Sequence, residues 1–103
     1  MINVFISQPM AGRTDDEILK EREQAILKIK NVIKEDDVHI IDSFFEQNAP
    51  ADANPLWYLG CSIIKLAYAD VAYFCKGWND TRGCRIEHKC AEEYNIEIIE
   101  EQV

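Results

Sequence analysis

Several kinds of segment are missing from the sequence, and each absence excludes a class of protein. No stretch approaches the roughly 20 apolar residues of a membrane-spanning helix. The first ten residues, MINVFISQPM, lack the basic start and the longer apolar run of a secretory signal peptide. Lys and Arg number 11 against 19 Asp and Glu, and the formal net charge of -8 opposes binding to nucleic-acid backbones or anionic membranes. We therefore expect a cytoplasmic protein that binds neither nucleic acid nor membrane.

Metal and cofactor motifs are missing as well. The 4 cysteines form no CxxC pair and have no histidine at the spacing of a zinc site. The segment QPMAGR lacks the glycine spacing of a P-loop or of a dinucleotide-binding fingerprint. Neither His39 nor His88 has a nucleophilic Ser or Cys at a recognisable spacing. We expect reduced, structural cysteines, no metal and no cofactor, and these observations oppose ATPase, dehydrogenase and triad-hydrolase functions.

What is present indicates one α/β domain over residues 1–103. No repeat, low-complexity tract or linker divides the chain, and its 103 residues allow one modest core. Four β-rich segments alternate with helical ones. Strands are expected at 2–7, 38–42, 70–75 and 96–100, and helices from a capping box at 14–17 to about residue 34, at 55 to about 69, and between 77 and 95.

This alternation predicts the arrangement of the sheet and the place of a ligand. Nearly continuous apolar strands indicate a parallel sheet covered on both faces. Right-handed crossovers leave few arrangements, and the flavodoxin-like three-layer sandwich with strand order 2-1-3-4 is the one we predict. Ligands of such sheets bind beyond the carboxyl ends of the strands, where the strand order reverses. In this chain the loops SQPMAGR (7–13) and KGWNDTRG (76–83) would meet there.

One carboxylate interrupts the apolar face of the last helix. At about 100° per residue, Glu87 falls in the middle of a face that otherwise holds Cys84, Ile86, Cys90, Ala91 and Tyr94. Helix side chains lean toward the N-terminus, so Glu87 is expected to point back to the predicted crevice. A partly desolvated, ionised carboxylate there suits a nucleophile or a general base. The alternatives are a structural carboxylate satisfied by Arg or backbone donors, and a carboxylate that reaches solvent.

Three segments, FISQPMAGRT, ADVAYF and GWNDTRGCRIEH, occur in an order that resembles the nucleoside 2-deoxyribosyltransferase superfamily, above all its short branch common in phages and prophages. The resemblance covers most of the chain. It implies a flavodoxin-like, usually dimeric domain that acts on N-glycosidic bonds of nucleosides or nucleotides, with Glu87 attacking the anomeric carbon. It also implies that residues 81–83 match the family's Ser/Thr-x-Gly segment, and that residues 7–13 close over sugar and phosphate or base.

The resemblance and the residue types together predict a binding site around Glu87. Backbone amides at residues 81–84 are candidates for binding a phosphate or a sugar hydroxyl. Trp78 is expected to stack on a base or to anchor its loop, and Asp80 to contact the ligand, protonate a leaving base or form a turn. Arg13 is a phosphate ligand or a solvated loop residue. The predicted substrate-binding residues are Phe5, Ser7, Gln8, Pro9, Met10, Arg13, Trp78, Asp80, Thr81 and Gly83.

Two positions depart from the family pattern. Many relatives carry a tyrosine at the place of Phe5 and an aspartate at the place of Ser62. Two functions therefore stand side by side. The retained Glu87 favours a 2-deoxyribosyltransferase or deoxynucleotide N-glycosidase. The two departures favour a non-catalytic module that holds a nucleotide-derived ligand.

Two further features lie outside the predicted site. The helix from Pro55 to about Ala69 is apolar nearly all round, with Lys65 its clearest charge, so we expect its outer face to bury against a second copy. Arg22 lies amid the apolar face of the first helix, and we expect its stem to cover the core edge with the charged group in solvent.

The connection between Asp42 and Asn54 is longer than most connections in compact domains. It is typical of a lid. Phe44 and Phe45 are expected to cover a base or to pin the loop.

Overall fold

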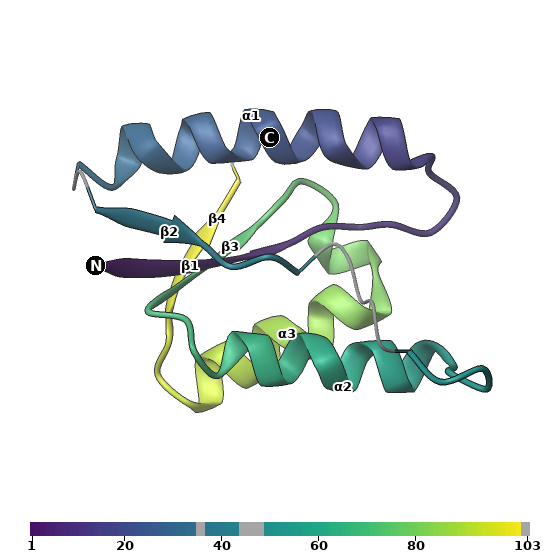
Figure 1. Ribbon diagram of the computed structural model, residues 1–103. Coiled ribbons are helices and arrows are strands. Elements are labelled where there is room, and N and C mark those ends of the chain that lie inside the picture. The colour runs from purple at the N-terminus through teal and green to yellow at the C-terminus, as the bar shows by residue number, and fades with distance from the viewer. Residues whose placement is uncertain (35–36, 44–48, 102–103) are drawn as a thin grey trace.

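The computed structural model describes residues 1–34, 37–43 and 49–101 (Figure 1). Residues 44–48 of the predicted lid, which include Phe44 and Phe45, lie outside the described residues. The elements follow in the order β1 (Ile2–Ser7), α1 (Asp15–Val32), β2 (Val38–Ile40), α2 (Pro55–Leu66), β3 (Val71–Phe74), the 3-10 helix η1 (Trp78–Asp80), α3 (Arg82–Glu93) and β4 (Glu97–Glu100).

The strands form one parallel sheet with the order β2-β1-β3-β4, which confirms the predicted flavodoxin-like α/β sandwich. The central strand β1 pairs on both sides, and Val4 lies opposite Ile40 of β2 and Val71 of β3. In Figure 1, α1 covers one face of the sheet, and α2 and α3 cover the other. The order reverses between β1 and β3, so the loops after these two strands meet at one end of the molecule.

The helix starts follow from local sequence. Thr14 Oγ1 accepts a hydrogen bond from the Glu17 amide at 3.2 Å, and Glu17 Oε1 accepts one from the Thr14 amide at 3.1 Å, which is the predicted capping box of α1. At α2, Asn54 Oδ1 accepts from the Trp57 amide at 2.9 Å, and Pro55 occupies the first turn. The N-cap of α3 is Thr81, whose side chain makes no capping hydrogen bond.

Alternation along the strands divides the core into two clusters, one on each face of the sheet. The first packs against α1 and contains Val4, Ile6, Ala25, Ile29, Val71, Tyr73 and Cys75. The second packs against α2 and α3 and contains Phe5, Leu66, Ala72, Phe74 and Ala91. Because Phe5 and Ser7 alternate with Val4 and Ile6, they face the layer that carries Glu87.

Arg22 corrects one expectation. It is 8% exposed, and its guanidinium donates from Nη1 to Gln8 Oε1 at 3.3 Å and from Nη2 to the Ile41 carbonyl at 2.9 Å. Burial lowers the pKa of Arg22, and the negative charge of Asp42 opposes that effect. The expectation of a solvated guanidinium is wrong, because the ends of β1 and β2 supply acceptors at the core edge.

The cysteines carry free thiols, as expected. Burial raises the pKa of Cys75 to about 12 and that of Cys84 to about 11, so both thiols are protonated near neutral pH. Within residues 1–34, 37–43 and 49–101, no three Cys, His or carboxylate side chains gather as metal ligands. In the same ranges, no helix combines the length and the apolar character that crossing a bilayer requires.

Candidate functional site

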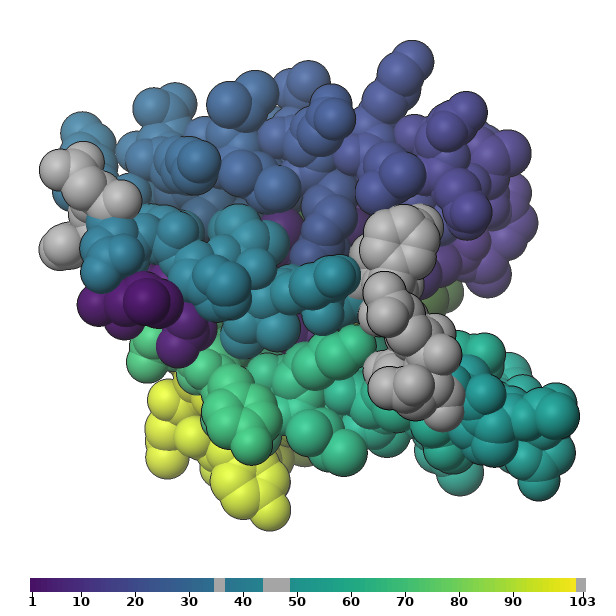
Figure 2. All heavy atoms as spheres, viewed as in Figure 1, coloured from purple at the N-terminus to yellow at the C-terminus, as the bar shows by residue number. Residues whose placement is uncertain are grey.

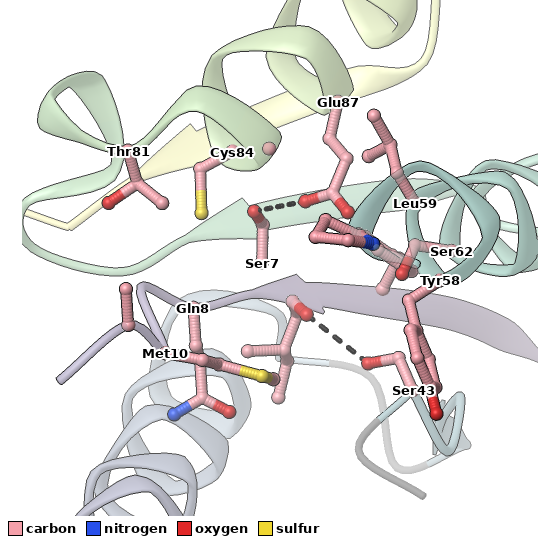
Figure 3. A pocket seen from close by; sticks show the side chains of 15 residues that line it. Ser7, Gln8, Met10, Ser43, Tyr58, Leu59, Ser62, Thr81, Cys84 and Glu87 are labelled. Carbon is pink, nitrogen blue, oxygen red and sulfur yellow. Dashed lines mark hydrogen bonds between the residues drawn. The ribbon is translucent and has the colours of Figure 1, made fainter. Parts of the chain in front are cut away.

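A cavity of about 280 Å³ lies beyond the carboxyl ends of β1 and β3, where the topology predicts a ligand (Figure 3). Its volume is close to the lower end, roughly 300 Å³, of the range for small-molecule sites. Its walls come from β1, the loop that follows β1, Ser43, α2 and α3. The lining residues are Phe5, Ile6, Ser7, Gln8, Met10, Ala11, Ser43, Pro55, Tyr58, Leu59, Ser62, Thr81, Gly83, Cys84 and Glu87.

Three elements converge on the carboxylate of Glu87. The residue belongs to the second turn of α3 and is 7% exposed. Ser7 Oγ, at the end of β1, donates a hydrogen bond to Glu87 Oε1 at 2.6 Å. Ser62 of α2 also lines the cavity on this side. Figure 3 shows the side chain of Glu87 descending from α3 toward Ser7, with Ser62 beside it. The carboxylate is therefore fixed in position within a cavity.

The environment of Glu87 contains two opposing effects on its pKa. Burial raises the pKa above the usual value for a glutamate, because the charged form loses hydration. The hydrogen bond from Ser7 and the nearby hydroxyl of Ser62 favour the ionised form and lower the pKa. A held, partly desolvated carboxylate of this kind suits a nucleophile or a base.

This raised pKa predicts how stability depends on pH. The unfolded chain ionises Glu87 near its ordinary pKa, whereas the folded chain resists ionisation until a higher pH, so the folded state binds more protons between the two values. The stability contributed by Glu87 is present below the unfolded pKa and is lost as pH rises through the folded pKa. We expect Glu87→Gln to raise Tm above that of the wild type at pH 8, and to raise it less at pH 4.

Thermal denaturation of both proteins at several pH values measures this difference. Glu93→Gln, an exposed position on the same helix, is the control and should show no such pH dependence. A constant difference in Tm between Glu87→Gln and wild type from pH 4 to pH 8 would contradict a raised pKa of Glu87 in the folded protein.

The thiol that lines the cavity is not a nucleophile. Burial and the nearby charge of Glu87 raise the pKa of Cys84 to about 11. Its side chain is 3% exposed. Glu87, the one carboxylate of the described lining, is therefore the candidate nucleophile.

The cavity brings together most of the predicted site residues. Phe5, Ser7, Gln8, Met10, Thr81, Gly83 and Glu87 all line it. Gln8 belongs to the lining, yet its Nε2 donates to the Ile18 carbonyl at 3.0 Å and to Glu21 Oε1 at 3.1 Å, and its Oε1 accepts from Arg22. These bonds hold the first loop against α1, so Gln8 acts in the structure mainly as an anchor.

The other predicted residues lie outside the lining. Arg13 Nη1 donates to the Pro9 carbonyl at 2.8 Å and pairs with Glu21 Oε1 at 2.9 Å. The Trp78 ring stacks on His88, with centroids 3.9 Å apart and an interplanar angle of 6°. Asp80 is exposed at the end of η1. Arg13 is thus engaged with an acidic partner, and Trp78 is anchored by packing.

Residues of α2 are the part of the site that sequence reasoning missed. Pro55, Tyr58, Leu59 and Ser62 all line the cavity. Their spacing of i, i+3, i+4 and i+7 places them on one face of a helix, which is a signal that the sequence carries. The helix is apolar nearly all round, however, so its pattern does not indicate which face meets the crevice.

Comparison with known proteins gives a family for the chain without an activity. No curated protein matches it, and no solved structure matches it. Residues 2–100 match the model of a family described as "Domain of unknown function (DUF4406)". Since that match spans nearly the whole chain, the protein belongs to the DUF4406 family.

Proposed function

We propose that the protein cleaves the N-glycosidic bond of a nucleoside or nucleotide, with Glu87 as the nucleophile. The observation that carries the proposal is the buried Glu87 carboxylate, held at 2.6 Å by Ser7 inside a cavity at the switch point of the sheet. The resemblance of the three sequence segments to the nucleoside 2-deoxyribosyltransferase superfamily supplies the reaction class.

The reaction balances with Glu87 and water. A Glu87 oxygen forms a bond to the anomeric carbon while the bond from that carbon to the base nitrogen breaks. The electron pair goes to the base, which takes a proton from water and leaves hydroxide. The transition state resembles an oxocarbenium ion, which an adjacent carboxylate stabilises. A water molecule, or a second base, then attacks the anomeric carbon, loses its proton to that hydroxide and releases the Glu87 carboxylate.

A second function is favoured by a specific observation. Ser62, which lines the cavity, stands where relatives of the superfamily carry an aspartate. Together with Phe5, which lacks the hydroxyl of a tyrosine, this leaves the described lining without a second acid. A module that binds a nucleotide-derived ligand without turnover needs no such group.

One experiment separates the two functions. The purified chain is incubated with each 2'-deoxynucleoside and each 5'-monophosphate, and free base is measured by chromatography while Tm is measured in parallel. An enzyme releases base. A binding module raises Tm and releases no base. A ligand at about 100 times its Kd adds about 2.7 kcal/mol to the free energy of unfolding. Neither release nor stabilisation with any of these compounds would reject both functions.

The assembly of the protein is a separate proposal. We propose a homodimer formed through the outer face of α2 and α3. Large apolar side chains lie exposed along this face, and α2 forms much of the lower edge of the molecule in the view of Figure 2. With a net charge of -8, two copies repel each other least where charges are few, and α2 has one charged residue, Lys65. The exposed apolar residues are Leu56, Ile64 and Tyr68 on or beside α2, and Ile86 and Tyr94 on or beside α3.

A pair of matched substitutions tests the dimer. Ile64 of α2 and Leu27 of α1 are both 63% exposed, so neither substitution creates a buried charge. We expect Ile64→Asp to convert the protein to a monomer and Leu27→Asp to leave the dimer intact, as measured by sedimentation velocity. A wild type that sediments as a monomer at micromolar concentration would reject the proposal.

A further inference from the structure

We infer that Tyr58 holds the base of the ligand by stacking, with the sugar directed inward to Glu87; the inference rests on the proposed function. It assigns a role in base binding to α2. It also fixes which end of a nucleoside enters the cavity first.

The two ends of the cavity differ in chemistry. Its buried end carries hydroxyl groups and a carboxylate, from Ser7, Ser62 and Glu87. Its outer end is apolar and is flanked by the exposed side chains of Met10 and Tyr58. Figure 3 shows these two side chains coming from opposite walls, Met10 from the loop after β1 and Tyr58 from α2. A nucleoside has the same division, with a hydroxyl-rich sugar at one end and a flat, largely apolar base at the other.

The Tyr58 ring is suited to be a stacking platform. It is 46% exposed although it lines a cavity, and the other aromatic side chain of the described lining, Phe5, is buried in the core. Trp57 lies perpendicular to the Tyr58 ring, with centroids 5.2 Å apart at 86°. That contact leaves Tyr58 braced by a neighbouring ring.

Met10 forms the wall opposite Tyr58, and its flexible side chain can adjust to a bound base. Met10 is unbranched and polarizable, and sulfur packs well beside aromatic rings. A base lying between Met10 and Tyr58 would therefore contact apolar surface on both sides. Trp78, the aromatic residue that the sequence suggests for this role, is engaged with His88 and is absent from the described lining.

The test measures base binding separately from catalysis. In the Glu87→Gln chain, which lacks the proposed nucleophile, calorimetry gives Kd for 2'-deoxyadenosine, 2'-deoxyguanosine, 2'-deoxycytidine, thymidine and free adenine. We expect Tyr58→Ala to weaken binding of the nucleosides and of adenine by about 5- to 100-fold, as for loss of a base–aromatic stack. Tyr58→Phe keeps the ring and should bind within about twofold of its parent.

The control is Leu27→Ala, which removes an exposed side chain of α1 that lies outside both the cavity lining and the proposed dimer face, and it should leave Kd unchanged. Nucleoside binding that is unaffected by Tyr58→Ala overturns the inference and leaves the proposed function standing. Weaker binding in Tyr58→Ala, without base release by the wild type, supports the inference and rejects the enzyme. Absence of binding for all five compounds, in both the wild type and Glu87→Gln, overturns the inference and the proposed function together.

Discussion

Glu87→Gln should lower base release by about 10³-fold or more, because loss of a nucleophile removes the covalent route and leaves only binding and orientation. Glutamine has nearly the shape of glutamate, and its side-chain oxygen can still accept the 2.6 Å hydrogen bond from Ser7. It cannot supply the negative charge that attacks the anomeric carbon. Release of base from a 2'-deoxynucleoside, followed by chromatography at saturating substrate, measures the loss.

Two controls show whether that loss is chemical. Near-UV circular dichroism and calorimetric Kd should show a folded Glu87→Gln chain that binds nucleoside about as well as the wild type. Ser7→Ala keeps the carboxylate and removes one of its hydrogen bonds, so its pKa should rise and the acid limb of the rate profile should move to higher pH. Base release at the wild-type rate by folded Glu87→Gln would reject Glu87 as nucleophile.

Phe74→Ala should cost about 3–5 kcal/mol of stability, since the side chain is fully buried at the centre of the sheet. Its ring packs 5.7 Å from that of Trp78 and 4.8 Å from that of His88, measured between centroids. Domains of this size have a total stability of about 5–15 kcal/mol, so the variant should be far closer to unfolding. Urea denaturation followed by tryptophan fluorescence measures the change.

The comparison for Phe74→Ala is Leu27→Ala, a substitution at an exposed position of α1 outside the proposed dimer face, expected to change stability by less than about 0.5 kcal/mol. Equal urea midpoints for the two variants would show that the second core cluster contributes little. A large effect confined to Phe74→Ala would indicate that packing on Phe74 holds η1 and α3 in place. The position of Glu87 on α3 would then depend on this core residue.

The course of the chain follows closely from local patterns, and its differences from prediction have local causes. The capping box fixed the start of α1, and strand–helix alternation was enough to predict the sheet order. The predicted end of α2 at about Ala69 is too late, since the helix ends at Leu66. Beyond that point, Tyr68 and Ala69 donate to carbonyls three residues earlier, a tighter turn that apolar periodicity does not distinguish from α-helix.

A residue of the candidate site could be predicted from the sequence where it interrupted a regular pattern. It could not be predicted where its contacts depend on tertiary packing. Glu87 stood out because it was the carboxylate on an apolar helix face. Arg13 and Trp78 pair with Glu21 and His88, which lie 8 and 10 residues away in the chain, and their sequence surroundings do not indicate those contacts. Tyr58 was missed because every face of α2 is apolar enough to be buried.

The serine hydroxyl beside Glu87 also gives the cavity a direction for its protons. A hydroxyl has one hydrogen and two lone pairs, so a Ser7 that donates to Glu87 Oε1 can only accept from anything else. A sugar hydroxyl that meets Ser7 must then arrive as a donor. When Glu87 takes up a proton, one of its two oxygens becomes a donor, while the other can still accept the hydrogen bond from Ser7. The charge on a single carboxylate thus sets how many acceptors and donors the buried end of the cavity offers to a ligand.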